Sequence, residues 1–218
     1  MATENPGHMS HVHDKLAFDR LVFFSDAVLA IAITLMALEV RVPEGARLAD
    51  ALDILSSRLV MYVVSFLVIG VYWALHHRLF RLIHTIDGRL IWLNLAFLMF
   101  AALVPASTSL LREYGGQRES VIVYAVSVTL LGMTEFLIWV YAQKRELLEE
   151  ISPRVTRYIG LRILLAPTIF LVSIPIALLN PLAAELSWIF IAPLHVPLRH
   201  FFREEHRERS EIYGERPG

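Results

Sequence analysis

Six long apolar stretches constrain this sequence more than any other feature. They are residues 21–40, 52–75, 90–111, 120–142, 158–179 and 182–198. A helix needs about 20 mostly apolar residues to cross a bilayer. The last stretch is short and is interrupted by Pro193 and Pro197. We expect an all-α integral membrane protein with six transmembrane helices, because no segment between the stretches is long enough for a soluble domain.

The composition agrees with this fold class and excludes several functions. The chain is 56% hydrophobic, and soluble domains rarely reach that value. A formal net charge of −1 gives no indication of a nucleic-acid partner. The sequence has no cysteine, which excludes disulfides and thiolate metal sites.

The distribution of Lys and Arg predicts the orientation. With six spans both termini share one side of the membrane, and that side holds fifteen of the 20 basic residues. The other side holds Arg41, Arg47, Arg58, Arg112 and Arg118. Positive charge gathers on the cytoplasmic side, so both termini are expected in the cytosol.

The same layout predicts three regions. Residues 1–19 are expected to form a flexible cytosolic arm, residues 20–202 the membrane domain, and residues 203–218 a polar cytosolic tail. The arm contains His8, His11 and His13. A metal role for these three histidines is an alternative that we weigh below a simple solvated arm.

Charged and polar residues lie at the start of the first apolar stretch. Arg20 and Asp26 lie about 9 Å apart along a helix, so they are not neighbours on one helix face. Each is therefore expected to find partners on other helices, and the candidates are His76, His77 and Asn94. We predict a polar cluster of Arg20, Ser25, Asp26, His77 and Asn94. A structural clamp on the first helix is favoured over direct ion coordination, and the two roles are compatible.

Glu135 and Arg162 lie inside the fourth and fifth stretches. Ionisable residues at membrane depth are functional candidates because their insertion is costly. Their depths match, which predicts a structural ion pair between consecutive helices and, as the alternative, a proton relay. The structural interpretation expects Glu135→Gln to impair folding or assembly.

The body of the first stretch carries a bulky apolar stripe. Its residues recur at spacings of 4, 3, 4 and 3, as in a helix seam: Phe24, Val28, Ile31, Leu35 and Leu38. Small residues including Ala30 and Ala37 lie on another side, where they permit close helix packing. The stripe is therefore expected to face lipid or, in an oligomer, a central axis.

Familiar sequence motifs are missing. The sequence has no GxxxxGK[ST], HExxH or GxSxG motif. The Gly70-Val71-Tyr72 segment lies within a continuous apolar stretch, without the re-entrant loop that a carbonyl filter needs. No internal repeat is visible, so a symmetric pore would require several copies of the chain.

The residues around the first stretch resemble the transmembrane protein 175 family of potassium channels. Arg20, Phe24, Ser25 and Asp26 give its RxxxFSD pattern, followed by an apolar run from residue 27 to 35. The resemblance extends through the paired histidines at the end of the second stretch, and through Trp92, Asn94 and Pro105 in the third.

The resemblance implies a potassium-preferring passive cation channel with no carbonyl filter. A single six-span copy is similar to the prokaryotic form, a homotetramer whose first helix lines the pore. In the family Ile31 would form the apolar constriction, Leu35 and Leu38 further apolar layers, and Thr34 a polar position implicated in selectivity. Phe24 would join the structural polar network.

The resemblance also implies a multi-pass protein of a prokaryotic plasma membrane. It implies no enzymatic activity and no cofactor or bound metal, with potassium as the permeant ion. The runner-up is a proton- or ion-coupled secondary transporter, which Glu135 and Arg162 favour, although no inverted repeat supports it. A membrane enzyme and a non-conducting scaffold are further alternatives.

Overall fold

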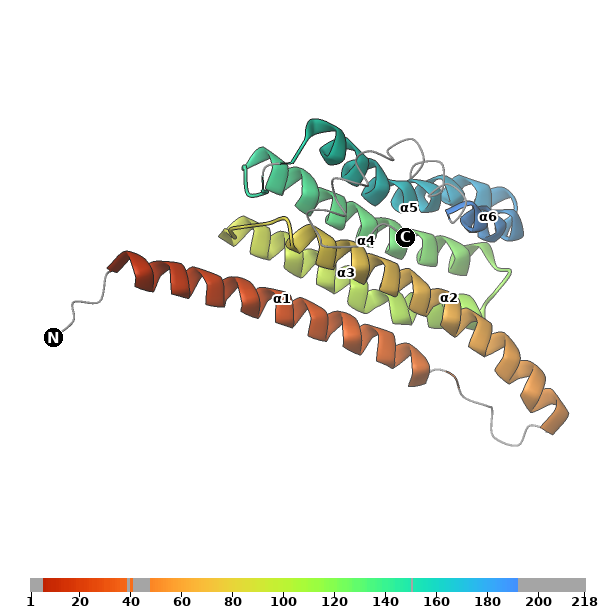
Figure 1. Ribbon diagram of the computed structural model, residues 1–218. Helices are drawn as coiled ribbons and strands as arrows, with labels where there is room; N and C mark the ends of the chain where they lie inside the picture. Colours follow the sequence, from red (N-terminus) through yellow and green to blue (C-terminus); the bar gives the residue numbers. More distant parts are fainter. Residues whose placement is uncertain (1–5, 39, 41–47, 150, 192–218) are drawn as a thin grey trace, which may run out of the picture.

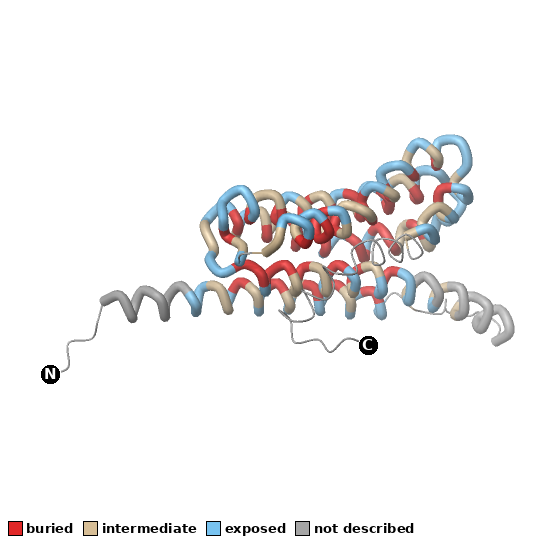
Figure 2. Tube along the Cα trace, turned by 45° about the horizontal axis from the view of Figure 1, so that its top comes forward, coloured by how far each residue is buried: buried red, intermediate tan, exposed pale blue. Residues whose placement is uncertain are grey.

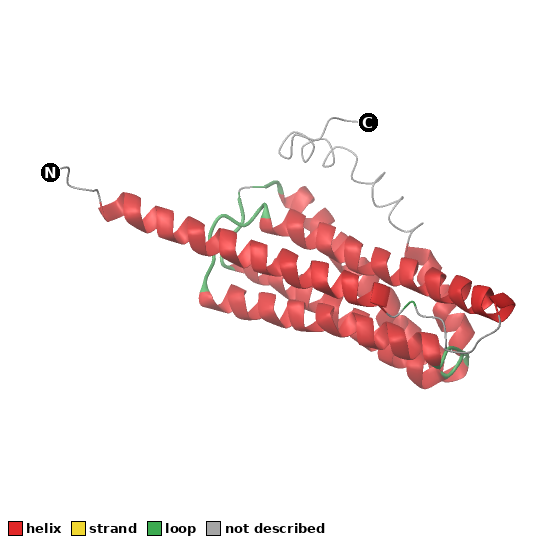
Figure 3. Ribbon diagram, turned by 90° about the horizontal axis from the view of Figure 1, so that it is seen from below, coloured by secondary structure: helices red, strands yellow, loops and turns green. Residues whose placement is uncertain are grey.

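The computed structural model describes residues 6–38, 40, 48–149 and 151–191. Within these ranges five long helices are followed by a short helix and a 3₁₀ turn (Figures 1 and 3). The elements are α1 (Pro6–Leu38), α2 (Leu48–Phe80), α3 (Gly88–Glu113), α4 (Arg118–Lys144), α5 (Pro153–Leu179), α6 (Pro181–Ser187) and η1 (Trp188–Phe190).

Five of the predicted spans are confirmed as helices long and apolar enough to cross a membrane. The sixth predicted span, residues 182–198, overlaps the short α6 and η1. Its remainder, from residue 192, lies outside the described residues. At the other end, α1 begins at Pro6, so the helix includes part of the segment expected to be a flexible arm.

The helices form a bundle with α1 along one edge. α3 packs on α4 and α4 packs on α5, while α1 packs on α3 and α2. Figure 1 shows α1 and α5 on opposite sides of the bundle. Figure 2 shows that the buried residues face the interior and the exposed ones the periphery, as expected for a bundle surrounded by lipid.

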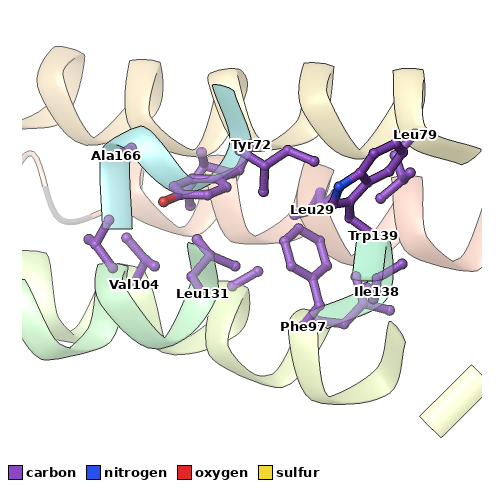
Figure 4. Packing of buried hydrophobic residues seen from close by; sticks show 14 of the residues in the cluster. Leu29, Tyr72, Leu79, Phe97, Val104, Leu131, Ile138, Trp139 and Ala166 are labelled. Carbon is purple, nitrogen blue, oxygen red and sulfur yellow. The ribbon is translucent and has the colours of Figure 1, made fainter. Parts of the chain in front are cut away.

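The core lies where α2, α3 and α4 meet α1 and α5. Leu29, Tyr72, Phe97 and Leu131 are buried there and come from four helices (Figure 4). Gly132 lets α4 lie close to α2 and α5, because a Cβ at this position would lie 2.5 Å from the Tyr72 hydroxyl and 2.7 Å from the Pro167 Cβ.

Side-chain caps define where helices begin. Asp87 precedes α3, where its Oδ1 accepts a hydrogen bond from the Leu90 N–H (2.8 Å) and its Oδ2 accepts one from the Tyr141 hydroxyl. These bonds, that of Tyr141 first, hold the pKa of the Asp87 carboxyl below its ordinary value. Ser152 caps α5 in the same way, with Pro153 at the first helical position.

Two loops at the same end of the bundle are tied together. The loop after α2 and the loop after α4 form an isolated antiparallel bridge between Ile83 and Leu148. The Glu149 N–H donates to the Leu82 carbonyl at 2.8 Å, and the His84 N–H donates to the Leu147 carbonyl at 3.0 Å. The bridge fixes the end of α2 relative to the start of α5.

Candidate ion pathway and the polar contacts behind it

The apolar stripe of α1 is exposed in the single subunit. Ile31, Leu35 and Leu38 are 57%, 45% and 58% exposed. Phe24 is 50% exposed, and Val28 is half-buried. Among the residues that the structure describes, Ile31, Leu35 and Leu38 therefore keep about half of their surface uncovered, which is available to lipid or to another copy of the chain.

The inward face of α1 differs from the face we predicted. Ala30 and Ala37 were expected to make the close contacts, but both are exposed. The buried positions on α1 are instead Leu21, Ser25, Leu29, Ala32 and Met36. Their spacings of 4, 4, 3 and 4 residues keep them on one face of the helix. In this apolar helix small size alone does not mark the packing side, because larger side chains also fit into the grooves of neighbouring helices.

Thr34 is exposed beside the stripe. Its hydroxyl donates to the Ile31 carbonyl of the same helix at 2.9 Å. The hydroxyl oxygen keeps acceptor capacity while its donor is satisfied. A polar group is thus presented on the exposed side of α1, one turn from Ile31.

Ser25 joins α1 to α3. Its hydroxyl donates to the Leu21 carbonyl at 2.9 Å and accepts a hydrogen bond from the Asn94 Nδ2, also at 2.9 Å. Ser25 and Asn94 are both buried. Buried polar groups are costly unless they are bonded, so this contact favours one position of α1 against α3.

Asp26 joins α1 to α2. The Trp73 Nε1–H donates to the Asp26 Oδ1 at 2.8 Å. His77 stacks on Trp73, with ring centroids 5.6 Å apart and planes 25° apart. Of the other two predicted members, the side chains of Arg20 and Phe24 are exposed. The structure thus places Ser25, Asp26 and Asn94 where α1 meets α2 and α3. His77 contacts this cluster only through Trp73.

The buried histidine is His76 rather than His77. Its Nδ1 lies 2.9 Å from the Glu135 Oε2, and both side chains are almost inaccessible. The His76 ring stacks on Phe97, with centroids 4.5 Å apart and planes 4° apart. Adjacent residues on a helix point about 100° apart, which explains why only one of the two imidazoles enters the bundle.

The predicted partner of Glu135 was Arg162, and the structure places His76 there instead. Arg162 is half-buried in a groove beside Arg78 and Leu75 of α2. Matching depth did not determine the pairing, because α4 also contacts α2 in the bundle. The Glu135 contact therefore joins α4 to α2.

The sequence analysis missed Trp73 as a functional contact. An indole N–H that is placed in a membrane helix usually needs an acceptor. Asp26 has no partner on its own helix, so the need of the Trp73 indole for an acceptor is the signal that could have indicated the Trp73–Asp26 bond. In the part of the chain that the structure describes, no group of three or more His, Cys, Asp or Glu side chains is placed to hold a metal ion. The side chains of His8, His11 and His13 lie outside that part.

Comparison with known proteins identifies relatives over the first half of the chain. The family model of the endosomal/lysosomal potassium channel TMEM175 matches residues 20–105. A potassium channel of a Chryseobacterium species is 45% identical over 89 residues, which are 41% of this chain and 46% of that protein. The human endosomal/lysosomal proton channel TMEM175 is 33% identical over 127 residues, which are 56% of this chain and 25% of that protein.

A solved structure extends the likeness to most of the chain. The crystal structure of a lysosomal potassium-selective channel TMEM175 homolog from Chamaesiphon minutus matches with a TM-score of 0.70 and 26% identity. The match covers 84% of this chain and 98% of that one. By sequence, the chain spans about half the length of the bacterial relatives and about a quarter of the animal ones.

Proposed function

We propose that the chain is a subunit of a potassium-preferring passive cation channel, on the premise that its residues 20–105 match the family model of the endosomal/lysosomal potassium channel TMEM175. Four copies would surround one pore, with α1 of each copy facing the axis. The relatives named above are channels, and none is named as an enzyme. Potassium is the permeant ion, and the proposal requires no cofactor.

The proposal rests on the difference between the two faces of α1, one buried and one exposed. Leu29, Ala32 and Met36 are buried against the rest of the subunit. Ile31 and Leu35 lie on another face of α1, where the described helices leave both side chains about half exposed. In a symmetric assembly, such a face on an edge helix supplies one strip of a shared central surface.

Ions would pass apolar rings rather than a carbonyl filter. One Ile31 from each subunit would form the narrowest ring, with Leu35 and Leu38 in further layers. A narrow apolar ring disfavours water and bare ions and so gates by dewetting. Thr34 presents a hydroxyl next to these rings, which supports a role in discriminating between cations.

The polar contacts at the inner end of α1 would act as a clamp rather than an ion site. The clamp comprises Ser25, Asp26, Trp73, His77 and Asn94, and the exposed Arg20 and Phe24 flank it on α1. The Ser25–Asn94 and Asp26–Trp73 bonds fix the rotation of α1 on its two neighbours. Rotation matters because it decides which α1 side chains reach the axis.

The proposed topology has six spans with both termini in the cytosol of a prokaryote. The channel domain would occupy residues 20–202, with residues 182–198 as the sixth span and 203–218 as a cytosolic tail. Basic residues at the end of α2, the end of α4 and the start of α5 support this orientation, because they gather at one end of the bundle. The plasma membrane is the corresponding location.

Recording from the full chain reconstituted in planar bilayers tests the function. We expect unitary currents that reverse near the potassium equilibrium potential. Ile31→Asn should hydrate the ring and raise the leak current. Leu171→Asn is the matched control, because Leu171 is 53% exposed on α5 and lies away from α1. Equal currents in the Ile31→Asn variant and the unmodified chain would remove Ile31 from the pore.

One observation favours the second candidate, a proton-coupled transporter. His76 and Glu135 are buried titratable groups in contact at membrane depth, as in proton relays. A transporter would show saturable, proton-dependent flux without unitary events in the same recordings. Passive unitary currents that persist in a His76→Gln variant would instead assign this pair to structure.

A further inference from the structure

Phe24 lies on the same exposed side of α1 as Ile31 and Leu38. These residues follow one another at intervals of seven, which is two helical turns less about 20°. Their exposed fractions are alike, at 50%, 57% and 58%. The segment from residue 20 to 38 has no proline or glycine to kink it, so this phase is kept along the continuous helix (Figure 1). A rotation of α1 that turns Ile31 toward a central axis therefore turns Phe24 toward the same axis.

The polar contacts next to Phe24 hold its direction. Ser25 accepts a hydrogen bond from Asn94 of α3, and Asp26 accepts one from Trp73 of α2. Successive residues of a helix point about 100° apart, so Phe24 does not share the direction of either contact. Its ring is accordingly half exposed, whereas Ser25 is buried. The clamp thus presents the ring of Phe24 away from its own subunit.

Four such rings would surround the ion path in the tetramer, on the cytosolic side of Ile31 and about 10 Å from it along the helix. This step rests on the proposed function, because one subunit provides only one ring. The face of an aromatic ring carries a negative electrostatic potential and attracts cations. The Phe24 ring therefore differs in chemistry from the aliphatic layers at Ile31 and Leu35.

A cage of aromatic rings favours one class of cation. Quaternary ammonium ions are the cations that aromatic cages recognise, because their charge is spread over alkyl groups that contact the ring faces. A hydrated potassium ion gains less, since its water shell separates it from the rings. Val28, one turn further into the membrane on the same stripe, is half-buried and offers an apolar surface to the alkyl groups.

Arg20 narrows the class of cation further. It lies one turn closer to the cytosol than Phe24 on the same side of α1, and its side chain is exposed. Four guanidinium groups at this level repel a cation in proportion to its charge. A polyamine with several charges is therefore disfavoured, and a monovalent cation with apolar groups is favoured.

We propose that the four Phe24 rings form a binding site for monovalent quaternary ammonium ions that enter from the cytosol. The bound ion lies between the level of Arg20 and the Ile31 constriction. Because it is too large to pass the constriction, it blocks the potassium current. Phe24 is thus assigned to the ion path rather than to the polar clamp beside it.

The test uses tetrapentylammonium on excised patches from cells that express the full chain, because a patch exposes one known side of the membrane. We expect block from the cytosolic side, with at least tenfold weaker block from the outer side. Phe24→Leu keeps an apolar side chain and removes the aromatic face, so the concentration for half block should rise about tenfold. Phe24→Tyr keeps the ring and should retain the block. Each variant is compared with its own current before the blocker is added.

Phe23→Leu is the matched control, because Phe23 is 70% exposed and points about 100° away from Phe24 on the same helix. It should retain the block, and an equal loss in the Phe23→Leu and Phe24→Leu variants would overturn the site. Stronger block from the outer side of the unmodified chain would also overturn it, without any variant.

Two further outcomes separate this site from the proposed function. Absence of potassium current in the unmodified chain would contradict the channel itself. Potassium current that cytosolic tetrapentylammonium leaves unblocked would overturn the Phe24 site and leave the channel assignment standing. Spermine should block more weakly than tetrapentylammonium, and Arg20→Gln should strengthen the spermine block severalfold. Unchanged spermine block in that variant would remove the charge of Arg20 from the selection of the ligand.

Discussion

The two faces of α1 are built from similar residues and have opposite surroundings. Leu29 and Met36 are buried in the subunit, while Leu35 and Leu38 on the same helix are about half exposed. What distinguishes the faces is the polar residues near the start of the span. Ser25 and Asp26 bond to α3 and α2, and these bonds select the side that turns inward. Because lipid is as apolar as leucine, hydrophobicity alone does not decide which face of a membrane helix packs inward, and polar contacts can decide it.

Substitutions on the two faces are therefore expected to have different effects. Changes on the packed side of the bundle should reduce stability. Changes on the exposed stripe should alter conduction and leave stability nearly unchanged. The expected losses of stability differ in size, and the largest belongs to the deepest polar contact.

Glu135→Ala should cost the most, about 3 kcal/mol in the free energy of unfolding, because it leaves His76 buried without its partner. Denaturation of the full chain in mixed micelles measures this loss. Glu135→Gln keeps an acceptor for His76 and should lose less. A Glu135→Ala variant as stable as the unmodified chain would show that the contact does not hold α4 to α2.

Gly132→Ala should cost about 1–3 kcal/mol by overpacking, since its new Cβ meets Tyr72 and Pro167. Gly70 offers the matched control on a neighbouring helix. A Cβ at Gly70 meets nothing within 4 Å, so Gly70→Ala should be neutral or gain up to about 1 kcal/mol in helix propensity. Equal melting temperatures for the two variants would argue against the tight α4–α5 approach.

Asn94→Ala should cost about 1 kcal/mol, because it removes the donor to Ser25. It should also change the conductance, because α1 loses a contact that fixes its rotation. Ser127→Ala is the control, since that exposed hydroxyl bonds only within its own helix among the contacts described. A destabilised Asn94→Ala variant with normal conductance would show that this contact does not control the pore.

Asp87→Ala should also cost about 1 kcal/mol, from the lost cap of α3. The pKa of Asp87 is lowered in the folded state, so its contribution is present above the unfolded pKa of about 3.9 and disappears as the pH falls through the folded value. Thermal unfolding from pH 7 to pH 3 measures this. Asp87→Asn keeps a cap without titrating, so its stability should fall less over that range.

The helices themselves could be predicted from the sequence, because length and apolar content decide what crosses a bilayer. Five predicted spans agree with α1 to α5. The facing of side chains could not be predicted in the same way. Ala30 and Ala37 suggested a packing face that the structure leaves exposed. A helix that is apolar all round gives no amphipathic signal to correct that error.

The partners of buried polar residues were predicted in part. Asn94 and Ser25 both need partners at the same depth, and the structure joins them by a hydrogen bond. The sequence pairs Glu135 with Arg162, whereas the structure places His76 against Glu135. Depth along the membrane follows from residue number, but the rotation of a helix and its neighbours do not. Pairings across the bundle therefore need the three-dimensional arrangement.

Cysteine accessibility tests the central claim, that the exposed stripe of α1 faces the ion path, most directly. The native chain has no cysteine, so a single substitution has no background. A charged methanethiosulfonate reagent reacts with a thiolate, which forms in contact with water and not in lipid. Ile31→Cys and Leu171→Cys are compared during recording in reconstituted bilayers. The account predicts that the reagent blocks current only through the Ile31→Cys channel. Unaltered current through the Ile31→Cys channel, with block of the Leu171→Cys channel, would contradict it.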